Sequence, residues 1–381
     1  MPNLLLVAFS LAIGLAVAEF AVRILEPQPL VDIDNHLYTR DTSLRYRLNP
    51  GYHGRLSNLA DFDGIEVAIN SQGMRNEELG RKQPAETRLL LLGDSFAFGW
   101  GVEQDETFAA QLEAGLRTDM PTVRVLNGGV PGYGPVDIVA WLEAYGLDLE
   151  PDIVLVTLFL GNDLIDATEK HRQVDFAATP ADGSEADRLR DAIYRRSHVV
   201  RLLKRTLPAS LIRQIRGSEP WSVTYLRDLL ESYALDETEL AREGREASAV
   251  ALARFAELAE RHDFQPLIAL LPGRLQVRDD RWQRGLDSLG ADAEAYDPHR
   301  PADIFGDLAG DAGIPVTDLT PAFRAAVSAG GEPIFFRYDP HWTPDGHLLA
   351  ARELYDFVLT SMLNQALGQA AERAPDAEPD A

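Results

Sequence analysis

The 381-residue chain contains no cysteine. This absence excludes disulfide bonds, cysteine-ligated zinc, a cysteine nucleophile and the lipidated cysteine of a bacterial lipoprotein. Basic residues are scarce, since 36 Lys and Arg stand against 60 Asp and Glu, and the formal net charge is −24 at pH 7. Binding to phosphate backbones requires patches of Lys and Arg. We therefore expect no nucleic-acid partner.

The N-terminus carries an apolar run of membrane-spanning length. The stretch "LLLVAFSLAIGLAVA" extends from Leu4 to Ala18 without a charge, and it reaches Val22 if Glu19 is tolerated at the boundary. Nineteen helical residues span roughly 28 Å, close to the thickness of a bilayer core. We expect residues 1–25 to be a retained membrane anchor or a signal peptide cleaved after Ala18, with a buried core helix as the remaining alternative.

The charges near this run bear on its orientation. No Lys or Arg precedes the run, whereas Arg23, Arg40, Arg45 and Arg47 follow it. The positive-inside rule alone would keep the following domain in the cytoplasm. A start codon assigned too late would also explain the missing basic residues. Our expectation is a membrane-anchored or exported protein that faces the periplasmic, extracytoplasmic side.

The rest of the chain alternates between apolar strands and helices. Residues 26–87 are predicted to form an extension of loops and short strands, including a turn at Gly73 and the start of a polar helix after it. Buried strands are predicted in "TRLLLLGDS" and "VRVLNGG", and further strands in "DIVLVTLFLGND", in "QPLIALLP" and from Ile314 to Asp318. Helices are predicted from about Thr107, with Asp105 as cap, and in "PVDIVAWLEAYGL" and "SAVALARFAELAERH". Two more are predicted, one that includes "FGDLAGDAG" and ends near Gly313, and one from about Pro344 to Leu367. This alternation predicts a parallel sheet flanked by helices.

Two segments depart from that alternation. Residues 165–245 are charged and predict a helical insertion, within which "YRRSHVVRLLKRTLP" is basic and amphipathic. Such a segment is either a helix with a solvated face or a contact for an anionic surface. The Ala-, Pro- and acid-rich residues 367–381 predict a disordered tail.

Polar and glycine-bearing loops follow three of the predicted strands. Ser95 stands just past the first strand, Gly132 lies in "NGGVPGYG" after the second, and Asn162 follows the third. Catalytic groups collect at the carboxyl ends of strands in such sheets. Backbone N–H groups beside glycine and an Asn amide can stabilise an oxyanion formed when a serine attacks a carbonyl. The alternative is structural, with the glycines and Ser95 in turns and Asn162 capping a helix.

The tetrapeptide YDPH occurs at 296–299 and at 338–341, and the second copy continues as "WTPDGH". Four blocks, "GDSFAFGWG", "NGGVPGYG", "FLGND" and "DPHWTPDGH", resemble in order those of the SGNH/GDSL hydrolases. The resemblance covers roughly residues 68 to 365. It implies a three-layer α/β/α, flavodoxin-like domain over residues 88–366. It also selects His341, in the second YDPH copy, over His299 in the first as the histidine of the site. Asp297 of the first copy is then expected to be a turn or cap residue. His347 is expected to be a packing or supporting residue.

The resemblance also implies the roles of the site residues. Ser95 would be the nucleophile, His341 the base and Asp339 the residue that orients it. The N–H groups of Ser95 and Gly132, with the Asn162 side chain, would form the oxyanion hole. The spacing departs from the family's usual Asp-x-x-His, because Tyr338 stands where that aspartate would be. The D-x-H-W form with Trp342 is similar to alginate O-acetyltransferase-like members, and Asp345 is an alternative orienting residue.

These observations predict an enzyme that needs no cofactor and no metal. We expect a serine ester hydrolase that cleaves short-chain acyl esters, including O-acetyl groups, on a glycan or lipid. An O-acyltransferase of cell-envelope polysaccharide would use the same residues. A binding protein that has kept the fold and lost activity is the alternative from another class.

Overall fold

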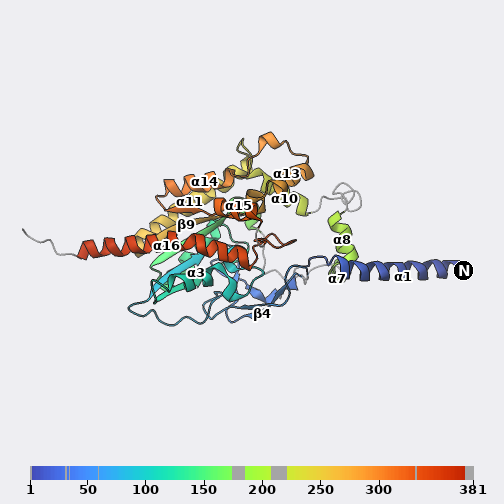
Figure 1. Ribbon diagram of the computed structural model, residues 1–381, viewed down its shortest axis with the longest axis horizontal. Helices are drawn as coiled ribbons and strands as arrows, with labels where there is room; N and C mark the ends of the chain where they lie inside the picture. Colours follow the sequence, from blue (N-terminus) through green and yellow to red (C-terminus); the bar gives the residue numbers. More distant parts are fainter. Residues whose placement is uncertain are drawn as a thin grey trace, which may run out of the picture.

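A computed structural model describes residues 2–30, 32–33, 35–58, 60–173, 185–206, 221–330 and 333–373. Its centre is a five-stranded sheet in the order β10-β9-β8-β6-β7, with every neighbouring pair parallel. The strands are β6 (Thr87–Leu92), β7 (Val123–Asn127), β8 (Ile153–Phe159), β9 (Gln265–Leu271) and β10 (Val316–Asp318). The chain visits these positions in the flavodoxin-like order 2-1-3-4-5. The predicted parallel sheet is therefore confirmed (Figure 1).

Helices cover both faces of this sheet, because its strands bury side chains on both sides. In β6, Leu90 and Leu92 join one hydrophobic cluster, whereas Leu89 and Leu91 join the other. The first cluster is completed by helices α4 (Pro135–Trp141), α11 (Glu239–His262) and α14 (Arg300–Asp311). The second is completed by α3 (Phe108–Leu116), α15 (Thr320–Ala329) and α16 (Pro344–Arg373). The three-layer α/β/α arrangement is confirmed.

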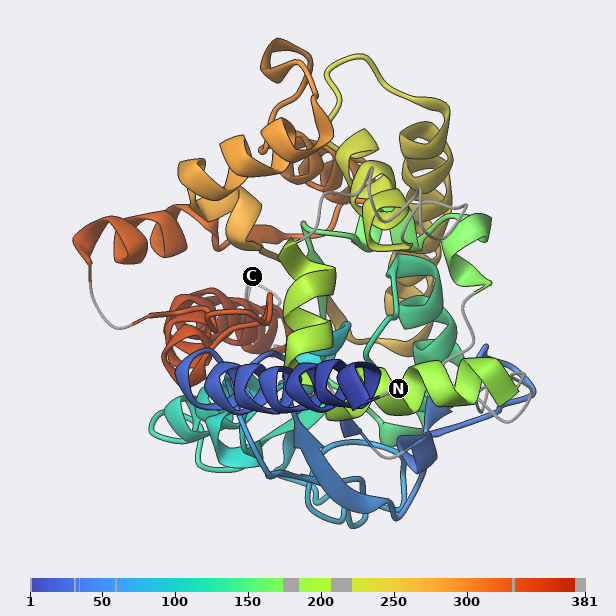
Figure 2. The same cartoon turned by 90° about the vertical axis from the view of Figure 1, so that its right-hand side faces the viewer.

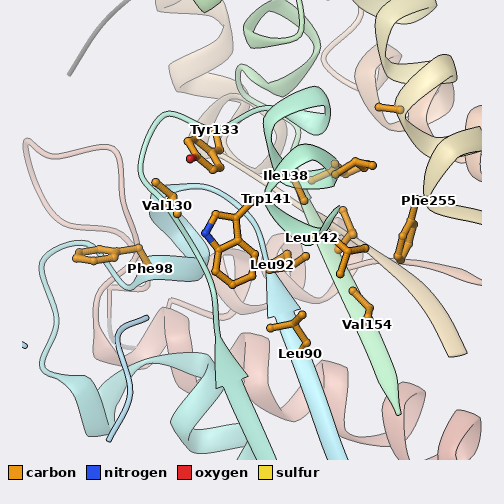
Figure 3. Packing of buried hydrophobic residues seen from close by; sticks show 14 of the residues in the cluster. Leu90, Leu92, Phe98, Val130, Tyr133, Ile138, Trp141, Leu142, Val154 and Phe255 are labelled. Carbon is orange, nitrogen blue, oxygen red and sulfur yellow. The ribbon is translucent and has the colours of Figure 1, made fainter. Parts of the chain in front are cut away.

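Trp141 shows how tightly the first cluster is packed. Its indole lies beside Leu92 and Val130 in the space between β6 and the loop after β7 (Figure 3). A Cβ at Gly128 would come within 2.7 Å of Leu92 Cδ2 and 3.2 Å of the Trp141 ring. Glycine at 128 therefore lets the loop after β7 approach the sheet closely, which brings that loop next to the end of β6.

Local sequence signals explain most helix starts, and two predictions were wrong. Helix α3 is capped by Thr107, whose Oγ1 accepts a hydrogen bond from Ala110 N at 3.3 Å, whereas Asp105 lies in the preceding 3₁₀ turn (Gln104–Glu106). Pro135 at the start of α4 suits a first helical turn, where its missing N–H costs nothing. The polar helix expected after Gly73 is absent, and the described residues there form turns before β6.

The N-terminal extension packs onto the α/β domain. It holds an antiparallel sheet of β1 (Asp32–Ile33), β4 (His53–Ser57) and β5 (Ile65–Ala68), and a ribbon of β2 (Tyr38–Thr39) and β3 (Arg47–Leu48). Its Tyr46, Leu56 and Met74 are buried in the first hydrophobic cluster. Arg75 is buried and donates to the carbonyls of Glu66, Phe98, Gly99 and Val102. The extension is thereby bound to the loop that follows the end of β6.

The remaining helices surround this core. Between β8 and β9 lie α5 (Asp163–Asp166), α6 (Glu169–Arg172), α7 (Glu185–Arg196), α8 (His198–Thr206) and α10 (Trp221–Glu231); α12 (Arg274–Val277) and α13 (Asp279–Leu289) follow β9. Helix α1 (Pro2–Leu25) projects away from the domain (Figure 1). By length and composition, its segment Leu5–Leu25 could cross a membrane. Helix α16 continues to Arg373, beyond the end expected at Leu367, and residues 374–381 of the predicted tail lie outside the described residues.

Candidate active site

Ser95 begins a short helix directly beyond the end of β6. Helix α2 (Ser95–Phe98) is capped by Asp94, whose Oδ1 accepts a hydrogen bond from Phe96 N at 2.8 Å. A Cβ at Gly93 would lie 2.1 Å from Thr157 Oγ1, so only glycine fits between β6 and β8 at this turn. The turn therefore places Ser95 at the carboxyl edge of the sheet, where the loops from several strands converge.

The structure brings Ser95, His341 and Asp339 together. His341 Nε2 lies 2.7 Å from Ser95 Oγ, and His341 Nδ1 lies 2.5 Å from Asp339 Oδ1. The same Asp339 oxygen accepts a hydrogen bond from His341 N at 3.0 Å. The backbone turns tightly enough here for a carboxylate two residues before the histidine to reach its ring. Asp345, the alternative orienting residue, is exposed in the first turn of α16.

The surroundings of Asp339 and His341 favour the charged form of the Asp339 carboxylate. Burial acts to raise the pKa of Asp339, but the hydrogen bonds and charge of His341 outweigh it and hold that pKa below its usual value. A carboxylate at Nδ1 favours the tautomer with a proton on Nδ1, which leaves Nε2 free to accept one from Ser95. The rings of Phe96 and Trp100 lie 4.8 and 5.8 Å from the His341 ring and limit its movement.

Asp61 and Arg274 hold the loop that carries Asp339 and His341. The Asp61 carboxylate accepts hydrogen bonds from three successive backbone N–H groups, those of Arg337, Tyr338 and Asp339, the shortest being 2.7 Å. Arg274 donates to the carbonyl of Asp339. Neither residue was predicted from the sequence, because no local pattern around position 61 points to a loop almost 280 residues away.

The oxyanion-hole candidates flank Ser95. Strand β6 lies between β7 and β8, so the loop with Gly132 and the loop with Asn162 emerge on either side of it. Gly132 has a φ of +81°, a conformation that favours glycine. Arg45 fixes this loop by donating to Gly132 O at 3.0 Å while it pairs with Asp137 at 2.6 Å. In the sequence, Arg45 stands out only as one of the basic residues that follow the apolar run, and its contact with the Gly132 loop was not predicted.

Asn162 is oriented by the partly buried carboxyl group of Asp166. Its Nδ2 donates to Asp166 Oδ2 at 2.6 Å and to Tyr225 Oη at 3.3 Å. Burial, with the nearby Asp94, raises the pKa of Asp166 to about 8. Burial also raises the pKa of Asp94, to about 6, although the hydrogen bond from Phe96 and the charge of His341 oppose this. This side of the site therefore holds carboxyl groups that keep their protons to higher pH than Asp339 does.

The other histidines of the two motifs lie elsewhere. His299 is exposed at the start of α14, where Asp297 Oδ1 accepts a hydrogen bond from its backbone N at 2.8 Å, as in a turn. His347 is fully buried, and burial lowers its pKa to about 3. Its Nδ1 accepts a hydrogen bond from Phe108 N at 3.2 Å, and its ring stacks on that of Phe108. Within the described residues, no three His, Asp or Glu side chains are grouped to hold a metal ion.

Residues 229–379 match the family of SGNH hydrolase-like domains described for the acetyltransferase AlgX. The predicted resemblance to SGNH hydrolases is thereby confirmed. The matched part contains Asp339 and His341, whereas Ser95, Gly132 and Asn162 precede it. No curated protein matches the sequence significantly.

Several solved structures are similar to this chain. An acetyl xylan esterase, AlAXEase, is 14% identical with a TM-score of 0.41, covering 71% of this chain and 99% of its own. LAE5, an alpha/beta hydrolase from the metagenome of Lake Arreo, Spain, is 15% identical with a TM-score of 0.39, covering 71% and 94%. Axe2, an acetylxylan esterase from Geobacillus stearothermophilus, is 14% identical in a catalytic mutant, with a TM-score of 0.38, covering 70% and 91%.

Proposed function

We propose that the protein is a serine ester hydrolase of SGNH type that cleaves short-chain acyl groups, including O-acetyl groups, from a carbohydrate. The observation that carries this proposal is the continuous chain of short contacts from Ser95 Oγ through His341 to Asp339 at the carboxyl edge of the sheet. A serine hydroxyl is a weak nucleophile until a neighbouring base removes its proton. The three residues provide the nucleophile, the base and the group that orients the base.

In the proposed reaction, His341 Nε2 takes the Ser95 proton as Oγ forms a bond to the acyl carbon. The resulting imidazolium stays paired with Asp339, which remains a carboxylate. When the tetrahedral intermediate collapses, the bond to the leaving alcohol breaks and His341 returns the proton to that alcohol. Water then repeats the sequence on the acyl-enzyme, which releases the acid and restores Ser95.

We assign the stabilisation of the negative charge on the carbonyl oxygen to three hydrogen-bond donors. These are the N–H groups of Ser95 and Gly132, and Asn162 Nδ2. Fixed donors of this kind are worth about 10²–10³ in kcat each. Asn162 keeps its short bond to Asp166, which holds the amide in place. Its longer contact with Tyr225 is the one that we expect the oxyanion to replace.

A second candidate function is O-acyl transfer to a carbohydrate. The family match favours it, because that family is described for an acetyltransferase and the match includes the Asp339–His341 loop. The acyl-enzyme would be the same, and a sugar hydroxyl would take the place of water. We further propose that α1 anchors the protein in a membrane, with the catalytic domain on the extracytoplasmic side.

The test follows hydrolysis of a short-chain activated ester by the full chain in detergent, beside Ser95→Ala. We expect turnover that Ser95→Ala abolishes without a change in unfolding. Added acetylated and unacetylated oligosaccharides then separate hydrolysis from transfer, by release of free acid or of newly acylated sugar. If Ser95→Ala retained the activity, the nucleophile would be another residue. A folded protein with neither activity would point first to a transferase whose acyl donor or acceptor the assay lacks, and then to a binding protein.

A further inference from the structure

A basic segment stands out in this acidic protein, and the proposed reaction does not use it. Residues 195–205, "RRSHVVRLLKR", contain five Arg and Lys and no Asp or Glu, in a chain of net charge −24. They form the end of α7 and most of α8. Both helices lie at the base of α1, where α1 leaves the domain (Figures 1 and 2).

Glu19 joins α8 to α1. Its carboxylate accepts hydrogen bonds from Ser197 Oγ at 2.8 Å and from the backbone N of His198 and Val199 at 2.8 and 3.0 Å. The first N–H groups of a helix have no partner within the helix, and a carboxylate placed there also interacts favourably with the helix dipole. The acidic residue that interrupts the apolar run of α1 therefore caps α8.

Arginines complete the same junction at the end of α7. Arg23 of α1 pairs with Glu19 at 2.9 Å and donates to the carbonyl of Arg196 at 2.6 Å. Arg201 of α8 is buried and donates to the carbonyls of Tyr194 and Arg195 at 3.0 and 2.7 Å. The last carbonyls of a helix accept such donors favourably. The three helices therefore form one unit, which we call the α1–α7–α8 junction.

The outer surface of this junction combines exposed apolar and cationic side chains. Large apolar side chains are about half or more exposed at Leu189 (63%), Ile193 (49%) and Leu203 (48%). Among the side chains that the structure describes here, Arg195, Arg196 and Lys204 are exposed cations. Apolar side chains beside Lys and Arg are typical of helices that lie in the headgroup region of a membrane.

We propose that α8 and the last turn of α7 lie on the surface of the bilayer that α1 enters, with their cations among anionic lipid headgroups. In Figure 1, α8 runs across the direction of α1, so an α1 that spans the bilayer places α8 along its surface. Anionic headgroups complement the basic segment, whereas they would repel the acidic remainder of the chain. This surface is independent of the proposed ester chemistry.

The proposed contact has a consequence for the catalytic domain. Helix α16 begins on the side of the domain that faces α1 and runs away from it (Figure 1). The Asp339–His341 loop directly precedes α16 and lies on that same side. The junction would therefore hold the candidate active site facing the membrane, where a substrate presented at the bilayer surface can reach it.

The test uses the absence of cysteine, which allows one fluorophore to be attached at one chosen position. The full chain is reconstituted in vesicles of phosphatidylcholine, with and without phosphatidylglycerol, as Ile193→Cys or Leu203→Cys. Val250→Cys is the matched control, because Val250 is a 73% exposed aliphatic residue on α11. Quenching by nitroxide-bearing lipids reports contact with the bilayer, and quenching by aqueous iodide reports contact with water.

We expect lipid quenching at positions 193 and 203 in the phosphatidylglycerol vesicles, and iodide quenching at position 250. Replacing Arg195, Arg196 and Lys204 by Gln together should lower the equilibrium constant for contact between these helices and the bilayer surface about 100-fold. Each cation contributes about fivefold to that constant. Iodide quenching at 193 and 203 equal to that at 250 would overturn the proposal. Protection from both quenchers would overturn it too, because protein would then cover this face, as would unchanged contact in the triple variant.

Discussion

Asp61→Asn tests whether the N-terminal extension positions the loop that carries Asp339 and His341. The Asp61 carboxylate holds three backbone N–H groups of that loop with four contacts of 2.7 to 3.2 Å. Asn keeps the shape, but one oxygen becomes an NH₂ group that faces N–H donors. At least one charge-assisted hydrogen bond is lost, and such bonds contribute about 1.5–3 kcal/mol. If the whole loss falls on the placement of Asp339 and His341, kcat/KM falls by about 10- to 150-fold.

The assay compares ester hydrolysis and urea unfolding for the wild type and Asp61→Asn. Asp63→Asn is the control, because Asp63 is exposed in the same segment and accepts a hydrogen bond from Ser57 Oγ. We expect Asp61→Asn to lower kcat more than it raises KM, and Asp63→Asn to change neither quantity. Wild-type kcat in Asp61→Asn would refute the reasoning, since the loop would then keep its geometry without this carboxylate.

Three further predictions concern the site and the core. Asp339→Asn should lower kcat by about 10⁴-fold, the size of effect known for Ser-His-Asp enzymes, while His299→Ala leaves it unchanged; similar losses in the two variants would contradict our choice of motif copy. Burial raises the pKa of Asp166 to about 8. Its protonated form therefore stabilises the folded state fully below about pH 4, and this stabilisation is lost as the pH rises to about 8. The loss is at most about 1.4 kcal/mol per pH unit. Asp166→Asn should therefore lose less stability between about pH 5 and about pH 8 in urea unfolding, and an unchanged pH dependence would show that Asp166 is already ionised. Phe255→Ala should lower the free energy of unfolding by about 3–5 kcal/mol without changing activity per folded molecule, because Phe255 is fully buried away from Ser95's loop in the cluster on the α11 face.

The boundaries predicted from the sequence were accurate where a local pattern determines the structure. The apolar run from Leu89 to Leu92 lies in β6, and the predicted strand in "QPLIALLP" is β9. The expected polar helix after Gly73 failed because the polar pattern there is not opposed by an apolar face that packing could bury. Asp105 looks like a cap, but Thr107 is the residue whose backbone leaves the helix at the right place.

The sequence by itself determined the alternation of strands and helices, the apolar length of α1, and which residue types follow each strand. These properties depend on side-chain periodicity and on neighbours a few positions away. Only the tertiary structure decided that Asp339 reaches His341 across two residues, that Asp61 and Arg274 hold their loop, and that Glu19 joins α1 to α8. The contacts of Asp61, Arg274 and Glu19 join segments far apart in the chain, so their geometry exists only in the folded molecule. The Asp339–His341 contact spans only two residues, but it depends on the backbone conformation of the loop that Asp61 and Arg274 hold.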